Sequence, residues 1–254
     1  MDQRGIGYPA PMSQSRMRAS RRRNRYQRGV KLLRAVAVVV AIVLVTPYVL
    51  TPLYWLVPPP STLMLWRWVT GQRVERTYVS LERMGPYLPV TVMEAEDARF
   101  CSHYGIDFQE MQEVLDTAED LGEMRGVSTI TQQTVKNLFL WPGRSYVRKA
   151  LELPLALWFD LILSKRRIME IYLNIAELGP NGEFGAQAGA RRAFDKPAAT
   201  LTPHEAALLA ASLPNPVTRD AKKPGPGLRR LAGLYQARAV RATGTDCVRV
   251  VHRR

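Results

Sequence analysis

The feature that most constrains this chain is a long stretch without any charged residue, residues 35–57. As a helix rising about 1.5 Å per residue, it is long enough to cross a hydrocarbon core of roughly 30 Å. A secretory signal is the alternative, but the run is long for one, and three prolines follow it where a small-residue cleavage site would stand. We therefore predict a retained single-pass transmembrane helix, which Pro47 and Pro52 either kink or end.

The net charge of +14 is unevenly distributed along the chain. Residues 1–34 carry +9 and residues 217–254 carry +8, so the middle of the chain carries −3. This distribution argues against a nucleic-acid-binding domain in the middle. The excess of Lys and Arg before the apolar run predicts a cytoplasmic N-terminus, with everything after residue 57 outside the cytoplasm.

Four segments follow from these patterns. Residues 1–34 are expected to be a disordered basic cytoplasmic tail, and residues 35–57 the transmembrane helix. Residues 58–218 are expected to form one extracytoplasmic domain. Residues 219–254 are expected to be a loose basic C-terminal tail with one weak helix at residues 228–240. Contact of this tail with lipid and plain disorder are equally open.

The domain is predicted to be mostly α-helical. From Val90 onward no strand-like alternation exceeds a few residues, whereas apolar residues recur three and four positions apart. Residues 62–69 form an apolar patch with two Trp, which either packs under the domain or lies in the membrane surface. Examples of the helical pattern are Leu151, Leu155, Trp158, Phe159 and Ile162, and also Ile168, Ile171, Tyr172 and Ile175, in a helix predicted to end at Gly179.

The two cysteines, Cys101 and Cys247, lie far apart and show no metal-ligand spacing. One disulfide is compatible with an oxidising compartment, but nothing in the sequence requires it, and we expect two free thiols.

Carboxylates cluster in residues 94–108, which contain Glu96, Asp97, His103 and Asp107. A helix terminus with a charged turn explains such a cluster without chemistry. A proton-transfer site explains it as well. His103 with the two Asp residues is also conceivable as a metal site, but we favour no metal bound by the protein.

A second polar stretch, GVSTITQQTVKN, occupies residues 126–137. Thr129 and Gln132 match a capping box, which predicts that a helix starts near Thr129. The free backbone N–H groups of a helix start suit a phosphate, and Lys136 falls on the same helical face. The alternative is an ordinary capped helix with its polar face in water.

Two further stretches contain polar pairs at helical spacing. Arg148 and Glu152 are four residues apart, which suits either a weak surface ion pair or a polar face directed at a ligand. Glu170 and Asn174 share a face, where a hydrogen bond at the edge of the core is the ordinary explanation. Thr202 is predicted to cap a structural helix, with a proline after it and a glutamate three residues on.

Taken in order, these stretches read EDxxFxxHxGxD, STITQQxxKN, RKxxE and KxxxxExYLN. Together they resemble the peptidoglycan glycosyltransferase family that also supplies the glycosyltransferase domains of class A penicillin-binding proteins. The resemblance covers about residues 85–218. It is greatest to the monofunctional biosynthetic transglycosylases, because the chain has an anchor and no SxxK-type acylation motif.

The resemblance implies a lysozyme-like, mostly helical domain at the inner membrane that polymerises lipid II. It also implies that Glu96 is the base and that Glu152, the second essential carboxylate, organises the pyrophosphate site. No cofactor is implied as required, and a divalent cation (Mg²⁺ or Mn²⁺) on the pyrophosphate is left open. The implied substrate-binding residues are Asp97, Ser128, Thr129, Gln132, Gln133, Lys136, Asn137, Arg148 and Lys149.

The implied partners are lipid II, the growing glycan chain, the membrane and other proteins of cell-wall synthesis or division. A lytic enzyme of similar fold and a non-catalytic scaffold are the rival interpretations. The sequence departs from the family pattern at Val127, where a second Gly is usual, at Cys101 and at Asp160. None of these departures removes a proposed catalytic group.

Overall fold

The computed structural model describes residues 14–117, 128–143 and 145–250. It divides into two compact units, Met1–Pro47 and Tyr48–Arg254, which are described separately.

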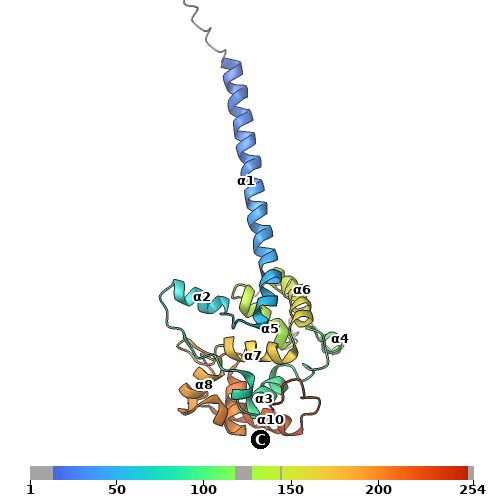
Figure 1. Ribbon diagram of the computed structural model, residues 1–254, viewed down its shortest axis with the longest axis vertical. Helices are drawn as coiled ribbons and strands as arrows, with labels where there is room; N and C mark the ends of the chain where they lie inside the picture. Colours follow the sequence, from blue (N-terminus) through green and yellow to red (C-terminus); the bar gives the residue numbers. More distant parts are fainter. Residues whose placement is uncertain (1–13, 118–127, 144, 251–254) are drawn as a thin grey trace, which may run out of the picture. The chain divides into compact units, whose positions relative to one another are not determined.

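The first unit contains most of one long helix, α1 (Gln14–Leu50) (Figure 1). The segment Gln27–Trp55 is long and apolar enough to cross a membrane, in agreement with the predicted transmembrane segment. The expectation of a disordered N-terminal tail is wrong from Gln14 onward, because these residues continue the helix, and extending a helix is easier than starting one. The rest of that tail lies outside the described residues.

The second unit is mostly helical, as predicted, with one short parallel pair of two-residue strands. Its strands are β1 (Glu75–Arg76) and β2 (Glu183–Phe184). Its helices are η1 (Thr51–Trp55), α2 (Thr62–Val69), η2 (Leu81–Arg83), α3 (Tyr87–Glu96), α4 (Phe108–Thr117), α5 (Ile130–Phe139), α6 (Tyr146–Ile162), α7 (Lys165–Ile175), α8 (Gly185–Phe194), η4 (Ala198–Thr200), α9 (Pro203–Ser212) and α10 (Pro226–Arg241).

The core forms where α5 packs against α6 and α7, and where α3 packs against α9 and α10 (Figure 1). The predicted apolar stripe of α6 is confirmed by Leu155 and Phe159, which are buried. All four predicted inward positions of α7 are buried too. This helix ends at Ile175 rather than at Gly179, because Ala176 already has an extended backbone.

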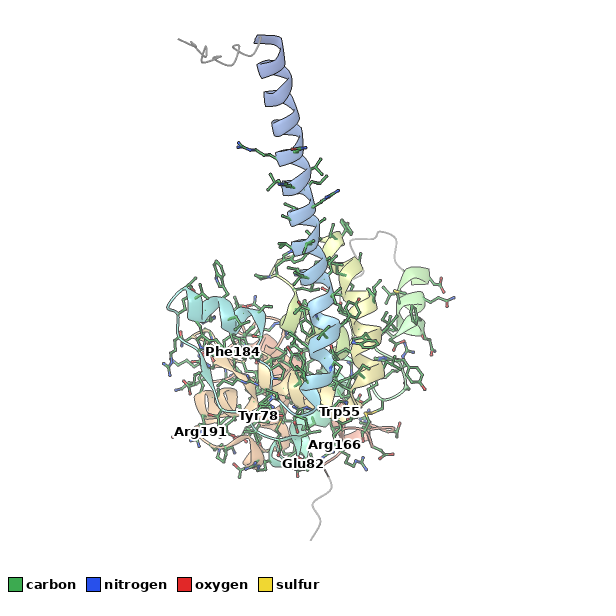
Figure 2. All side chains as sticks on the ribbon, turned by 45° about the horizontal axis from the view of Figure 1, so that its top comes forward. Trp55, Tyr78, Glu82, Arg166, Phe184 and Arg191 are labelled. Carbon is green, nitrogen blue, oxygen red and sulfur yellow. A yellow bond between two sulfur atoms is a disulfide. The ribbon has the colours of Figure 1, made fainter. Side chains whose placement is uncertain are left out.

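Polar residues of α7 hold the segment before α3, as expected for Glu170 and Asn174. Asn174 Nδ2 donates to the backbone oxygen of Val79, and Asn174 Oδ1 accepts from the Val79 N–H, both at 2.9 Å. Glu170 accepts from the backbone N–H of Leu81 at 2.8 Å. Glu82, from the segment before α3, and Arg166 of α7 form an exposed ion pair at 2.6 Å, and both residues are labelled in Figure 2.

The capping box predicted for α9 is confirmed. The Thr202 hydroxyl accepts from the Glu205 N–H at 3.3 Å, and the Glu205 carboxylate accepts from the Thr202 N–H at 2.8 Å. Pro203 occupies the first turn, where its missing N–H costs no hydrogen bond.

The apolar patch forms helix α2, and only one side of this helix packs under the domain. Met64 is fully buried against the core, whereas Trp66, Trp68 and Val69 are exposed. Packing under the domain therefore accounts for one side of this helix and leaves an apolar side on the surface.

The C-terminal segment is not the loose tail expected from its basic composition. Helix α10 packs on α9 and α3, and Leu228, Ala232, Val248 and Val250 are buried. Apolar residues at helical spacing within a basic sequence provide this buried side, while the arginines stay exposed. The compact unit therefore continues well past residue 218.

The expectation of two free thiols is wrong. Cys101 and Cys247 form a disulfide with their Cα atoms 5.8 Å apart. The packing of α10 on α3 brings the cysteines together across 146 residues of sequence, a proximity that their spacing does not indicate.

Candidate active site

Glu96 is the last residue of α3, and its carboxylate is oriented by a chain of hydrogen bonds. Gln133 of α5 donates from Nε2 to Glu96 Oε2 at 2.9 Å. Tyr172 of α7 in turn donates from its hydroxyl to Gln133 Oε1 at 3.0 Å. Three helices therefore position this one carboxylate, and Gln133, predicted from the sequence as a substrate-binding residue, contacts Glu96 directly.

Burial is the main reason why the pKa of Glu96 lies above its usual range. The Gln133 hydrogen bond and the charges of Lys136 and Arg219 lower this pKa, and neighbouring Asp97 raises it. A carboxylate whose pKa is raised from that of an ordinary surface Glu is better matched to accepting a proton near neutral pH.

Asp97, predicted to help bind substrate, is buried and hydrogen-bonded to other groups of the protein. Its carboxylate accepts from the backbone N–H of Ile130 at 2.9 Å, and His103 Nε2 lies 3.0 Å from both of its oxygens. Only 4% of Asp97 is exposed. These contacts tie the start of α5 to the end of α3, so Asp97 and His103 fix the position of Glu96 relative to Gln133.

The start of α5 is the capping box predicted from the sequence. The Thr129 hydroxyl accepts from the Gln132 N–H at 3.1 Å and donates to the backbone oxygen of Gly105 at 2.6 Å, while Gln132 Oε1 accepts from the Thr129 N–H at 3.0 Å. Both side chains are buried, so they serve the cap. Asp97 and this cap already accept hydrogen bonds from the backbone N–H groups of Thr129, Ile130 and Gln132, which are three of the groups on which the phosphate site was expected.

Positive charge converges on Glu152 in the first half of α6. Arg148 Nε lies 3.1 Å from Glu152 Oε1, and Lys149 Nζ lies 3.3 Å from Glu152 Oε2. Only 3% of Glu152 is exposed, so the surface ion pair left open by the sequence is excluded. Lys149 Nζ also donates to Ser128 Oγ at 2.8 Å, which places Ser128 beside the cations.

Lys136 interacts electrostatically with both carboxylates, Glu96 and Glu152. Burial lowers the pKa of its ammonium group. Glu152 and Glu96 both raise this pKa, whereas Arg148 and Lys149 lower it further. Lys136 is therefore close enough to both carboxylates to interact with their charges.

A cavity of about 480 Å³ opens beside these groups. This volume is in the range of small-molecule sites. Its polar lining includes Gln133, Lys136, Asn137 and Arg148, four of the residues predicted to bind substrate. Its apolar lining includes Leu140, Trp141, Ile175, Phe184 and Leu213.

Three residues near Glu96 were not identified from the sequence as site residues. Tyr172 was recognised only as an inward residue of its helix, yet its hydroxyl reaches Gln133. Arg219 and Tyr235 lie close enough to interact with the charge of Glu96, but both fall in the segment expected to be a loose tail. Their distance in sequence from residues 94–108 hides this proximity.

The departures from the family pattern leave this arrangement intact where it is described. Cys101 forms the disulfide, and Asp160 accepts from the Thr131 hydroxyl at 3.0 Å and from Lys165 at 2.6 Å. Val127 lies outside the described residues. Among the residues that are described, no group of three or more His, Cys, Asp or Glu side chains is arranged to hold a metal ion.

The geometry agrees with the matches to known proteins. Residues 64–237 match the model of the transglycosylase family. The biosynthetic peptidoglycan transglycosylase of Rhodopseudomonas palustris (strain HaA2) is 59% identical over 220 residues, which cover 86% of this chain and 97% of that protein. The proteins of the same name from Nitrobacter winogradskyi and Agrobacterium fabrum are 58% and 54% identical, over 85% and 79% of this chain and 96% and 89% of their own lengths. This chain belongs to the transglycosylase family and is a peptidoglycan glycosyltransferase.

Proposed function

We propose that this enzyme polymerises lipid II into glycan strands by transfer from undecaprenyl pyrophosphate to a sugar 4-hydroxyl, with inversion. The observation that carries this proposal is the pairing of one half-buried carboxylate, Glu96, with a separate cluster of cations around Glu152, and Lys136 interacts with the charges of both carboxylates.

Glu96 acts as the general base. Its carboxylate takes the proton of the attacking 4-hydroxyl, the hydroxyl oxygen forms a bond to the anomeric carbon of the donor sugar, and the bond from that carbon to the pyrophosphate breaks. The burial that raises the pKa of Glu96 suits this role. Gln133 holds the accepting carboxylate in place through its hydrogen bond.

The departing pyrophosphate gains negative charge as its bond to carbon breaks, so it requires positive charge more than a proton. Lys136 and Arg148 line the cavity, and Lys149 lies beside Ser128 at the start of α5. Charges fixed before the reaction stabilise the developing anion without rearrangement at the moment of transfer. Glu152 holds Arg148 and Lys149 in place and is a positioning residue for this cation cluster. A divalent cation that accompanies the pyrophosphate would enter as part of the substrate.

A glycan-cleaving activity is the rival chemistry. A hydrolase of lysozyme type has to protonate an alkoxide leaving group with a carboxylic acid placed near a second carboxylate. Here the second carboxylate, Glu152, is flanked by two cations, which favours a phosphate leaving group.

We also propose the membrane arrangement in which the N-terminus is cytoplasmic and the catalytic unit is periplasmic. The Lys and Arg excess before the apolar segment supports this orientation. The Cys101–Cys247 disulfide supports it independently, because disulfides persist in oxidising compartments. A polyprenyl-linked substrate lies in the same membrane, so an anchored enzyme meets it at high effective concentration.

The test is polymer formation from labelled lipid II by the full chain in detergent or vesicles. Glu96→Gln is expected to lower the rate roughly 10²- to 10⁴-fold, the usual contribution of a general base, while lipid II binding remains. Glu82→Gln, a change in an exposed ion pair, is the matched control and is expected to leave the rate unchanged. Near-normal polymerisation by Glu96→Gln, or release of fragments from purified glycan by the wild type, would refute the proposal.

A further inference from the structure

A second groove, of about 460 Å³, lies between α3 and α10. From α10, its walls include Leu234, Ala237, Arg238 and Arg241, which recur three and four residues apart and so share one helical face. From the α3 side, Glu94 closes it. We call this space the α10 groove.

The α10 groove lies next to the segment that carries the proposed base, because two of its lining residues, Glu94 and Ala98, stand two positions before and two positions after Glu96. Tyr235 is close enough to interact with Glu96, Arg219 and Arg238, as their influence on the pKa of its hydroxyl shows: burial and Glu96 raise this pKa, and the two arginines lower it. Residues two apart on a helix point to different sides, so Glu94 faces the groove whereas Glu96 faces Gln133. Tyr235 therefore interacts both with the base and with Arg238 of the groove, while Gln133, which donates a hydrogen bond to the base, lines the 480 Å³ cavity.

The α10 groove is lined by more positive than negative side chains. Arg238 and Arg241 line it against the single carboxylate of Glu94. Both arginines are exposed, and although Arg238 interacts with the charge of Glu94, neither guanidinium makes an ion pair or a hydrogen bond with another residue in the described part of the chain. A planar guanidinium is well suited to bind a carboxylate through two parallel hydrogen bonds.

We infer that the α10 groove binds the carboxylates of the peptide stem on the acceptor substrate, with Arg238 and Arg241 as the specificity-determining residues. The inference rests on the proposed function. If Glu96 takes the proton of the acceptor 4-hydroxyl, the peptide stem hangs from the adjacent sugar, one ring away from the base. The cation cluster at Glu152 is occupied by the donor pyrophosphate, so the acceptor stem turns toward the positive groups on the α10 side of Glu96.

The experiment compares two substrates with the full-length enzyme: lipid II with free stem carboxylates, and lipid II whose stem carboxylates are converted to amides. For the free carboxylates, Arg238→Ala/Arg241→Ala is expected to raise KM about tenfold, as for the loss of a charge-assisted pair, with kcat changed less than about twofold. For the amidated substrate, the same double variant is expected to match the wild type. Raised salt is expected to reduce the preference of the wild type for the free carboxylates.

Arg229→Ala is the matched control. It removes one positive charge, against two in the double variant, from the same helix at a position nine residues or about two and a half turns from Arg238, and hence on the opposite side. An equal KM change in this control, or an equal effect on both substrates, would overturn the inference in favour of non-specific attraction to anionic lipid. An unchanged KM in the double variant would also overturn it while leaving the proposed function standing, whereas a wild-type enzyme that makes no polymer would remove both.

Discussion

The Cys101–Cys247 disulfide should contribute strongly to the stability of the catalytic unit. It closes a loop of 146 residues, for which the chain-entropy relation gives about 5 kcal/mol, at the upper end of what disulfides contribute. A domain of this size loses roughly 2 to 4 °C of Tm per kcal/mol, so loss of the bond is expected to lower Tm by roughly 10 to 20 °C. The bond acts mainly by restricting the unfolded chain, and the native contacts of α10 remain when it is broken.

The measurement is thermal unfolding followed by circular dichroism, with the full chain in detergent, before and after reduction. Cys101→Ser/Cys247→Ser is expected to unfold at the temperature of the reduced wild type, and added reductant is expected not to change it further. Mass spectrometry after thiol alkylation of the unreduced wild type is expected to find no labelled cysteine. A labelled cysteine in the unreduced protein, or a Tm that falls by less than about 3 °C on reduction, would show that the bond does not form or does not restrict the unfolded chain as argued.

Three further perturbations address the site. Because burial raises the pKa of Glu96 above 4.5, the polymerisation rate should fall as the pH drops through that raised pKa. The half-buried charge also destabilises the folded wild type, so Glu96→Gln should unfold at a higher temperature than the wild type at pH 7. This difference in unfolding temperature should vanish below the pKa that Glu96 has in the unfolded state. Gly105→Ala should destabilise the protein by about 2 to 4 kcal/mol in urea titrations, because Gly105 has φ +77° and an added Cβ would lie 2.4 Å from the backbone oxygen of Ala156. Glu152→Gln should lower kcat about 100-fold in the lipid II assay, because Arg148 loses the charge that positions it, and wild-type kinetics would exclude that role.

The features that sequence reasoning predicts well are those set by neighbouring residues. The capping boxes at Thr129 and Thr202 depend on residues three positions apart, and the structure has both. The pairing of Arg148 with Glu152 needs only one helical turn. Spacing alone does not reveal burial, which is what separates the observed Arg148–Glu152 pair from a weak surface pair.

The features that were missed depend on contacts between distant segments. Composition makes the segment after residue 218 look like a tail, yet a few apolar residues such as Leu228 and Val248 are enough to bind it to the core. Once α10 is in place, Cys247 reaches Cys101, and Arg219 and Tyr235 reach Glu96. The hydrogen bond that the Ile130 N–H at the start of α5 donates to Asp97 is likewise a tertiary contact, because Asp97 lies at the end of α3.

The position of Glu96 at the end of α3 favours its role as a base but lowers the stability of the fold. The C-terminal end of a helix carries partial negative charge, so a carboxylate there is disfavoured beyond the effect of burial. Asp97 adds a second negative neighbour, and Lys136 and Arg219, from two distant segments, offset part of the penalty. A fold selected only for stability would replace Glu96 with a neutral residue. The destabilised carboxylate is retained at the one position where three helices, a lysine and the C-terminal segment meet, which is what a site for proton transfer requires.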